Sequence, residues 1–199
     1  MSAIDRRAAR VMGETWEAEI ARMLSVAPGC HVHRIPTPVT VVGKTTQDAR
    51  GRATFRGAFA ARQGVDLAGY ITAGVSVLPV AIEAKAAHVS GRWSFADALG
   101  LSRSAPMSHA ACMLDRYDRD GALAVVMLLA YHAGRECRVM YRWRALHSAW
   151  LSGIASIPWA DIEDVPSSAP IVGTRLHPTP RAMLDALEQA ALYAERRDA

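Results

Sequence analysis

The chain has 199 residues, of which 51% are hydrophobic and 21% are charged, and its formal net charge is +4. This composition is typical of one globular domain with enough apolar material for a core, and it excludes intrinsic disorder. Three scattered cysteines without a CxxC pair exclude a disulfide scaffold and a zinc ribbon. The sequence has no apolar run that could span a bilayer and no secretory pattern at its N-terminus, so we expect a cytoplasmic protein without a membrane partner.

The first predicted elements are a helix and an extended segment. Apolar residues recur at helical spacing over residues 3–24, and Pro28-Gly29 ends this helix. Residues 30–42 are expected to be extended, because a residue before proline is disfavoured from helical geometry and a β-branched run follows.

A basic arm is predicted next. Residues 43–57 are polar and rich in glycine and arginine, which predicts a protruding loop or arm inserted into the domain. The surrounding segment 34–62 has six cations and one acid, a net charge of +5. The cations are Arg34, Lys44, Arg50, Arg52, Arg56 and Arg62. This cluster is either a solvated loop or a surface that contacts nucleic-acid phosphates.

A strand hairpin is expected after the arm. Residues 64–71 and 75–85 have the composition of two strands separated by a short turn. Pro79 lacks a backbone N–H, so we expect one side of the second strand to be unpaired or bulged there.

The rest of the chain completes a single α/β domain over residues 1–199. Its order of helices and strand hairpins indicates one layered domain without internal repeats. The expected elements are a loop at 94–103, a helix at 105–117, paired strands at 122–131 and 136–143, short pieces over 144–178 and a C-terminal helix at 180–197.

The strongest chemical pattern is Asp66 followed later by Glu83-Ala84-Lys85. Residues two apart in a strand share a face, so Glu83 and Lys85 point the same way, and the hairpin brings Asp66 close to them. Two carboxylates beside an ammonium suit metal-assisted phosphodiester cleavage, although the same pattern also fits a cross-strand salt bridge. Lys85 is one of two lysines in a chain with 21 arginines, which favours a position that requires a compact ammonium.

Several blocks of sequence also carry a resemblance to a known family. They are Gly13-Glu14-Thr15-Trp16-Glu17, Arg34-Ile35-Pro36-Thr37-Pro38-Val39, the basic arm, Asp66-Leu67-Ala68-Gly69-Tyr70 and Ile82-Glu83-Ala84-Lys85. Over residues 13–190 the chain resembles the RecU family of Holliday junction resolvases, which belong to the PD-(D/E)XK nuclease superfamily. The resemblance implies a restriction-endonuclease-like core, in which helices flank a mixed central sheet, with a protruding basic stalk.

The resemblance also implies an activity and its partners. A RecU-like protein is expected to be a homodimeric, Mg²⁺-dependent endonuclease in which Mn²⁺ can substitute. It would resolve four-way DNA junctions by paired symmetric nicks in recombination and repair, with recombination proteins as further partners.

Residue by residue, the resemblance assigns a metal and catalytic site. Asp66 and Glu83 become metal ligands, with the Ala84 carbonyl as a third, and Lys85 becomes the catalytic lysine. Glu17 corresponds to the first-helix acid that reaches the site. The six cations of segment 34–62 become DNA contacts.

The sequence departs from the family pattern at three places, of which one is Ala86, where the family often has an acid after the lysine. Gly64-Val65 stands where the family places Thr-Thr, which removes hydroxyls that could orient a ligand or phosphate. His109 aligns with a glutamine of the family and is either a supporting polar group or an ordinary helix residue. His88, three residues after Lys85, is a further candidate for a phosphate contact.

Two other functions stay open at this point. One is a PD-(D/E)XK endonuclease that acts on other branched or duplex DNA. The other is a weakly catalytic DNA-binding protein that assists recombination. The complete set of Asp66, Glu83 and Lys85 argues for catalysis, whereas the missing Thr-Thr keeps the accessory function open.

Overall fold

The computed structural model of the chain describes residues 3–36, 39–47, 53–59, 64–73, 76–164 and 173–195. The helices are α1 (Ala3–Ser25), α2 (Phe95–Leu99), α3 (His109–Arg119), α4 (Trp143–Leu151), α5 (Trp159–Glu163) and α6 (Pro180–Glu195). The strands are β1 (Cys30–Arg34), β2 (Val39–Gln47), β3 (Ala53–Phe59), β4 (Leu67–Ala73), β5 (Ser76–His88), β6 (Arg92–Ser94), β7 (Leu123–His132), β8 (Arg135–Arg142), β9 (Ser156–Pro158) and β10 (Gly173–Arg175). Within these ranges no helix is long and apolar enough to cross a membrane.

Six strands form a mixed central sheet in the order β1-β4-β5-β7-β8-β10. β5 and β7 are parallel, and the other neighbouring strands are antiparallel. After β5 the chain passes through β6, α2 and α3 before it returns as β7, which supplies the long crossover that a parallel pair requires. The prediction of an α/β domain with a mixed central sheet flanked by helices is confirmed.

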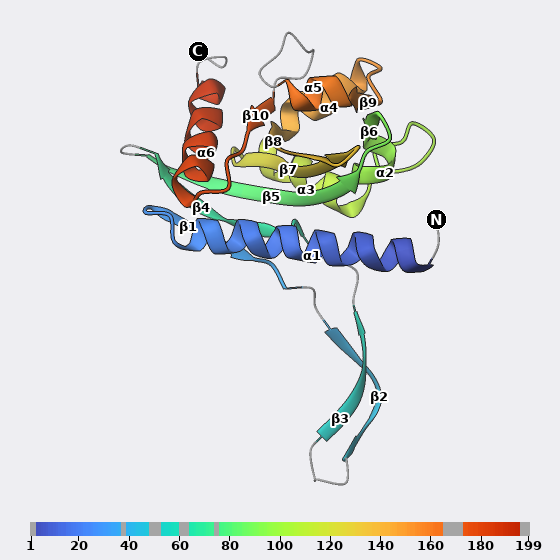
Figure 1. Ribbon diagram of the computed structural model, residues 1–199. Helices are drawn as coiled ribbons and strands as arrows, with labels where there is room; N and C mark the ends of the chain where they lie inside the picture. The colour runs from blue at the N-terminus through green and yellow to red at the C-terminus, as the bar shows by residue number, and fades with distance from the viewer. Residues whose placement is uncertain are drawn as a thin grey trace.

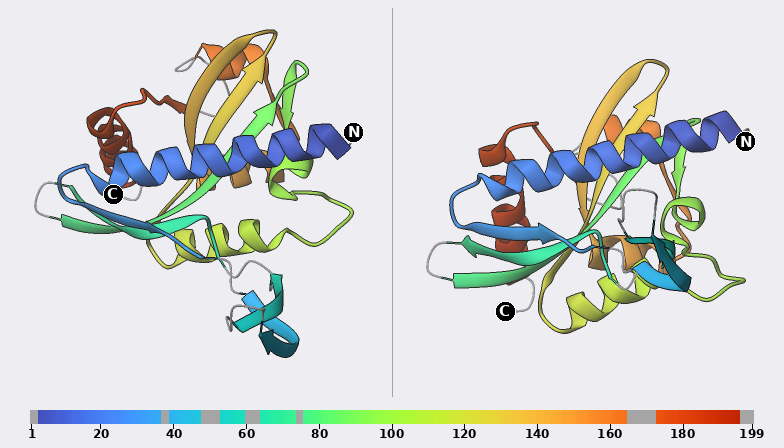
Figure 2. Two further views of the ribbon diagram at one scale, coloured as in Figure 1. Left: turned by 60° about the horizontal axis from the view of Figure 1, so that its bottom comes forward. Right: turned by 90° about the horizontal axis from the view of Figure 1, so that it is seen from below.

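Helices cover both faces of this sheet. α1 and α6 pack on one face, whereas α2, α3, α4 and α5 pack on the other (Figure 1; Figure 2). β7 lies in the middle, and its residues 123–130 are all buried because alternate side chains enter the two apolar layers. The predicted buried strand at 122–131 is therefore confirmed.

α1 is fixed to the sheet by its predicted apolar stripe and by polar contacts. Trp16 and Ile20 are fully buried, and the Trp16 indole N–H donates to the Met127 carbonyl at 3.0 Å. The Arg138 guanidinium stacks over the Trp16 ring at 5.5 Å and pairs with Glu19 at 2.8 Å. These contacts hold α1 across β5 and β7, with the residues of its buried side facing the strands.

The predicted hairpin of the central sheet is confirmed as β4 and β5, which pair from Leu67↔Ile82 to Ala73↔Ser76. Pro79 pairs with Tyr70 on the β4 side, whereas pairing with β7 starts only at Val80. The side of β5 that faces away from β4 is therefore unpaired at Pro79, as the missing N–H predicts.

The arm is a two-stranded antiparallel hairpin of β2 and β3, which pair with each other and form a separate sheet. Figure 1 shows this hairpin extending away from the central sheet. The sequence predicts a protruding loop or arm for residues 43–57, and the described part of this segment is an arm made of strands, since β2 and β3 enter it from both sides. Valine and threonine favour strands, and each strand supplies the backbone partners that the other needs in solvent.

Two boundaries of the predicted elements are wrong. The expected loop at 94–103 contains α2, whose N-terminus is capped by Ser94 and whose C-terminus ends at Gly100 with φ 64°. Because α2 has five residues, it is too short to show a helical repeat in the sequence. The helix expected at 105–117 is α3, which begins at His109 because Ser108 caps it: Ser108 Oγ accepts the Ala111 N–H.

Candidate active site

Asp66 lies at the point where β4 begins. Leu67 is paired with Ile82, so the residue before it is placed beside Glu83 and Ala84 of β5. The Asp66 side chain is 2% exposed, and its Oδ2 accepts the Ala84 N–H at 2.8 Å. The carboxylate thus accepts the backbone N–H of a β5 residue at a position where β4 does not pair with β5.

Glu83 and Lys85 lie on the same face of β5 and contact each other. Lys85 Nζ is 2.5 Å from Glu83 Oε1, and the Glu83 residue is 1% exposed. The Lys85 side chain keeps 24% of its surface exposed, so its ammonium connects a buried carboxylate with the solvent. Both predictions made from the spacing, a shared face and proximity to Asp66, fit this geometry.

The sheet is forked at this site. β5 continues to His88 in parallel pairing with β7, but on its other side β4 pairing stops at Ile82. The N–H and C=O of one strand residue point to the same side, so the Ala84 carbonyl faces the open side where Asp66 lies. The fork therefore gathers three oxygen-bearing groups: Asp66, Glu83 and the Ala84 carbonyl.

These groups fit a hard divalent cation. Mg²⁺ binds one or two carboxylates together with carbonyl and water oxygens. The second oxygen of Glu83, Oε2, is buried without a hydrogen-bond partner in the described part of the chain. A buried carboxylate oxygen is costly without a donor or a cation, so this atom suits a metal ligand.

Glu17, the acid predicted to reach the site from the first helix, is buried on α1. Among the described residues, no three His, Cys, Asp or Glu side chains form a group that could hold a metal. Glu17 is 7% exposed on α1, and its Oε1 accepts from Arg34 Nε at 2.8 Å. The carboxylate thereby connects α1 with the end of β1, close to where β4 begins.

The sequence did not indicate the contact between Arg34 and Glu17. Arg34 was a candidate for DNA contact and Glu17 for the metal site. They are 17 positions apart in the sequence, and one lies in a strand and the other in a helix. Only the docking of α1 on the sheet brings them together, and no local pattern encodes that docking. Half of the Arg34 side chain stays exposed, so it still presents positive charge at the surface.

The structure places the two candidate histidines on different elements, His109 on α3 and His88 on β5. His109 is exposed at the first position of α3. His88 is exposed at the end of β5 and its ring lies 5.5 Å from that of Tyr131. Since His88 is three residues after Lys85, it belongs to the opposite face of the strand.

The basic arm is described only in its backbone. Lys44 lies in β2 and Arg56 lies in β3. Arg50, Arg52 and Arg62 lie outside the described residues.

Comparisons with known proteins add no family: no family model matches the chain, and no curated protein matches its sequence. The function is therefore inferred from the residues of this chain and their geometry.

Proposed function

We propose that this protein is a divalent-metal-dependent endodeoxyribonuclease with a restriction-endonuclease-like core, similar to the RecU resolvases. One observation carries the proposal: Asp66, Glu83, Lys85 and the Ala84 carbonyl come together at the fork between β4 and β5. Two buried carboxylates and an ammonium with solvent access are the groups that metal-assisted phosphodiester hydrolysis requires.

Asp66, Glu83 and the Ala84 carbonyl would hold Mg²⁺, or Mn²⁺ in its place. When bound, the ion supplies an activated water and offsets the charge of the phosphate under attack. The Ala84 N–H orients Asp66 through Oδ2. Ala84 would therefore position one metal ligand, Asp66, with its N–H and provide another with its carbonyl. Glu83 is oriented in turn by its contact with Lys85.

Lys85 is assigned to the reacting atoms. Its ammonium is held by Glu83 Oε1, and part of its side chain stays accessible to a substrate. From there it can donate to a non-bridging phosphate oxygen or hold the attacking water in line. A compact ammonium suits this position, because three rotatable N–H donors can serve the carboxylate and the phosphate together.

The proposed substrate is four-way junction DNA in recombination and repair. A junction has approximate two-fold symmetry, and a homodimer with two equivalent sites could place one nick on each of two opposed strands. The basic arm is proposed to contact backbone phosphates at the branch point, which would select shape rather than sequence.

One observation favours the second function, a DNA-binding protein with weak catalysis. Val65, which stands in place of a hydroxyl residue of the family, is 2% exposed and packs in the apolar layer below α3 and α4. This position therefore stabilises the core and offers no polar group to the substrate.

The experiment that tests the proposal compares three DNA substrates in parallel. Purified protein is incubated with Mg²⁺, Mn²⁺ or EDTA and a mobile four-way junction, a Y-fork or a linear duplex. Paired nicks in the junction that require metal support the resolvase proposal. Cleavage of the fork or duplex at equal rates would favour the broader nuclease, and binding without cleavage would favour the accessory protein.

A further inference from the structure

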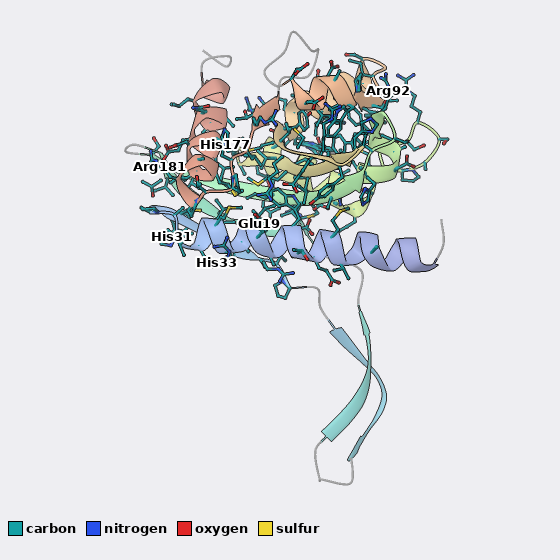
Figure 3. All side chains as sticks on the ribbon, viewed as in Figure 1. Glu19, His31, His33, Arg92, His177 and Arg181 are labelled. Carbon is teal, nitrogen blue, oxygen red and sulfur yellow. The ribbon has the colours of Figure 1, made fainter. Side chains whose placement is uncertain are left out.

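A second feature of the central sheet lies beside the candidate active site. On the face opposite α1, exposed residues of β1, β4 and the start of β5 form a surface that we call the platform. Its members are His31, His33, Tyr70, Thr72, Val77 and Pro79. The helices that pack extensively on β1 and β4 in the described structure are α1 and α6, and both lie on the other face. Figure 3 labels His31 and His33 on β1.

The centre of the platform is a pair of stacked rings. His31 and Tyr70 are directly opposed in the β1–β4 register, and their ring centroids are 4.7 Å apart with an interplanar angle of 29°. Tyr70 keeps 42% of its surface exposed. Gly69 permits the close approach of the two strands, because a Cβ there would overlap with the His31 carbonyl oxygen. The paired strands thus present two stacked, partly exposed rings at the surface.

The platform and the candidate active site share one face of β5. Tyr70 pairs with Pro79, and residues two apart in a strand share a face, so the platform lies on the same face of β5 as Glu83 and Lys85, with the buried Ala81 between them. Pro79 lies four residue steps along the strand from Glu83, which is about 13 Å. That length corresponds to about four nucleotides of B-form strand, and to fewer when the strand is extended.

The chemistry of the platform matches unpaired DNA. Aromatic rings bind bases by stacking without regard to sequence, and the face of a base is free only where the strand is unpaired. Arg34, which follows the platform on β1, is cationic, and no acid lies among the platform residues. We infer that the platform stacks an unpaired base of the strand whose phosphate reaches Lys85. This inference rests on the proposed nuclease function and narrows its substrate to DNA with an unpaired nucleotide within about four nucleotides of the cut.

The test uses junctions that carry a single 2-aminopurine at successive positions around the cut, with Ca²⁺ to allow binding without turnover. Stacking quenches this base, so wild-type protein should lower its fluorescence at one or two positions within about four nucleotides of the scissile phosphate. Tyr70→Leu should abolish the quench and weaken binding roughly 10-fold or more, the scale of removing one base–aromatic stack. Tyr70→Phe should retain both.

Controls keep the outcomes separate. Tyr131→Leu removes a ring on β7 that contacts His88 on the other face, and it should leave quench and binding unchanged. His31→Ala is the second variant and should reduce the quench if Tyr70→Leu does not fold. Unchanged quenching by Tyr70→Leu would overturn the inference but not the proposed nuclease function. A change in the molar mass of Tyr70→Leu relative to wild type would do the same, because it would identify the platform as a protein interface. A wild-type protein that neither binds nor cuts any of the three substrates would overturn both.

Discussion

The ammonium of Lys85 lies 2.5 Å from Oε1 of Glu83, and the two side chains share one face of β5. The other oxygen of this carboxylate is buried and accepts no hydrogen bond within the described structure. A purely structural ion pair would satisfy both oxygens, because burying an unsatisfied carboxylate oxygen is costly. This asymmetry favours a site in which Glu83 serves Lys85 with one oxygen and a cation with the other.

Lys85→Arg distinguishes a catalytic ammonium from a structural charge. Arginine keeps the positive charge, but its guanidinium is larger and planar and does not release a proton near neutral pH. We expect the rate of junction cleavage to fall by at least about 10²-fold in single-turnover assays, the scale of losing one positioned catalytic group. Arg144→Lys is the matched control, because Arg144 pairs with Asp118 at 3.0 Å on the surface, and it should cut at the normal rate. Near-normal cleavage by Lys85→Arg would make Lys85 a structural residue.

Shortening the arm tests whether it selects junctions. β2 and β3 pair with each other, so replacing residues 43–57 by a Gly-Ser turn removes no strand of the central sheet. We expect a folded protein whose preference for junction over duplex is reduced and whose log Kd depends less steeply on log salt, with the slope smaller by roughly one for each phosphate that the arm neutralises. A variant that keeps the arm but has glutamine at Lys44, Arg50, Arg52 and Arg56 should show the same weaker salt dependence. Unchanged junction selectivity after shortening would contradict the proposed function of the arm.

Gly69→Ala should destabilise the edge of the central sheet. A Cβ at this position would overlap with the His31 carbonyl oxygen and lie 2.8 Å from Val32 Cα, which are backbone atoms of β1. We expect the free energy of unfolding in urea to fall by about 1–3 kcal/mol or more. Gly13→Ala is the control, because nothing lies within 4 Å of its added methyl group on α1, and it should raise stability by about 0.5–1 kcal/mol. Equal stability of the two variants would contradict the close approach of β1 and β4.

Tyr141→Phe predicts a change in the pH dependence of stability. Burial raises the pKa of Tyr141, whose hydroxyl has no hydrogen-bond partner in the described structure. In the unfolded chain the phenol ionises near pH 10, so wild-type stability should decrease above that pH by up to about 1.4 kcal/mol per unit. The variant lacks this dependence and should be at least as stable as wild type at pH 7. Urea unfolding between pH 7 and 11 measures both effects, and identical pH slopes would contradict the buried phenol.

Elements with a clear sequence pattern were predicted well. Neighbouring residues alone determine three of these features, so the sequence is enough to recognise them. They are the apolar stripe of α1, the ten-residue apolar run of β7 and the unpaired side of β5 at its proline. α2 was missed because its helix depends on two capping residues rather than on a repeat. Residues 43–57 were predicted as a loop or arm rather than as strands because this stretch is polar and rich in glycine and arginine.

The candidate site was predictable only where it depends on strand geometry. The two-residue spacing of Glu83 and Lys85 predicts a shared face, and the hairpin register predicts the place of Asp66. The contact between Glu17 and Arg34 was not predictable, since it depends on how α1 docks on the sheet. The stacked rings of His31 and Tyr70 likewise require the pairing of β1 with β4, which the sequence does not state.

The rate of junction nicking as a function of Mg²⁺ concentration, measured for wild type and Asp66→Asn, tests the central claim most directly. Asparagine retains an oxygen that can accept the Ala84 N–H, so the variant should fold, but it lacks the charge that a cation requires. We predict saturable, Mg²⁺-dependent nicking by wild type, none in EDTA, and none by Asp66→Asn, which should still bind the junction. Nicking in EDTA, or wild-type rates for Asp66→Asn, would contradict the metal site at the fork of β4 and β5.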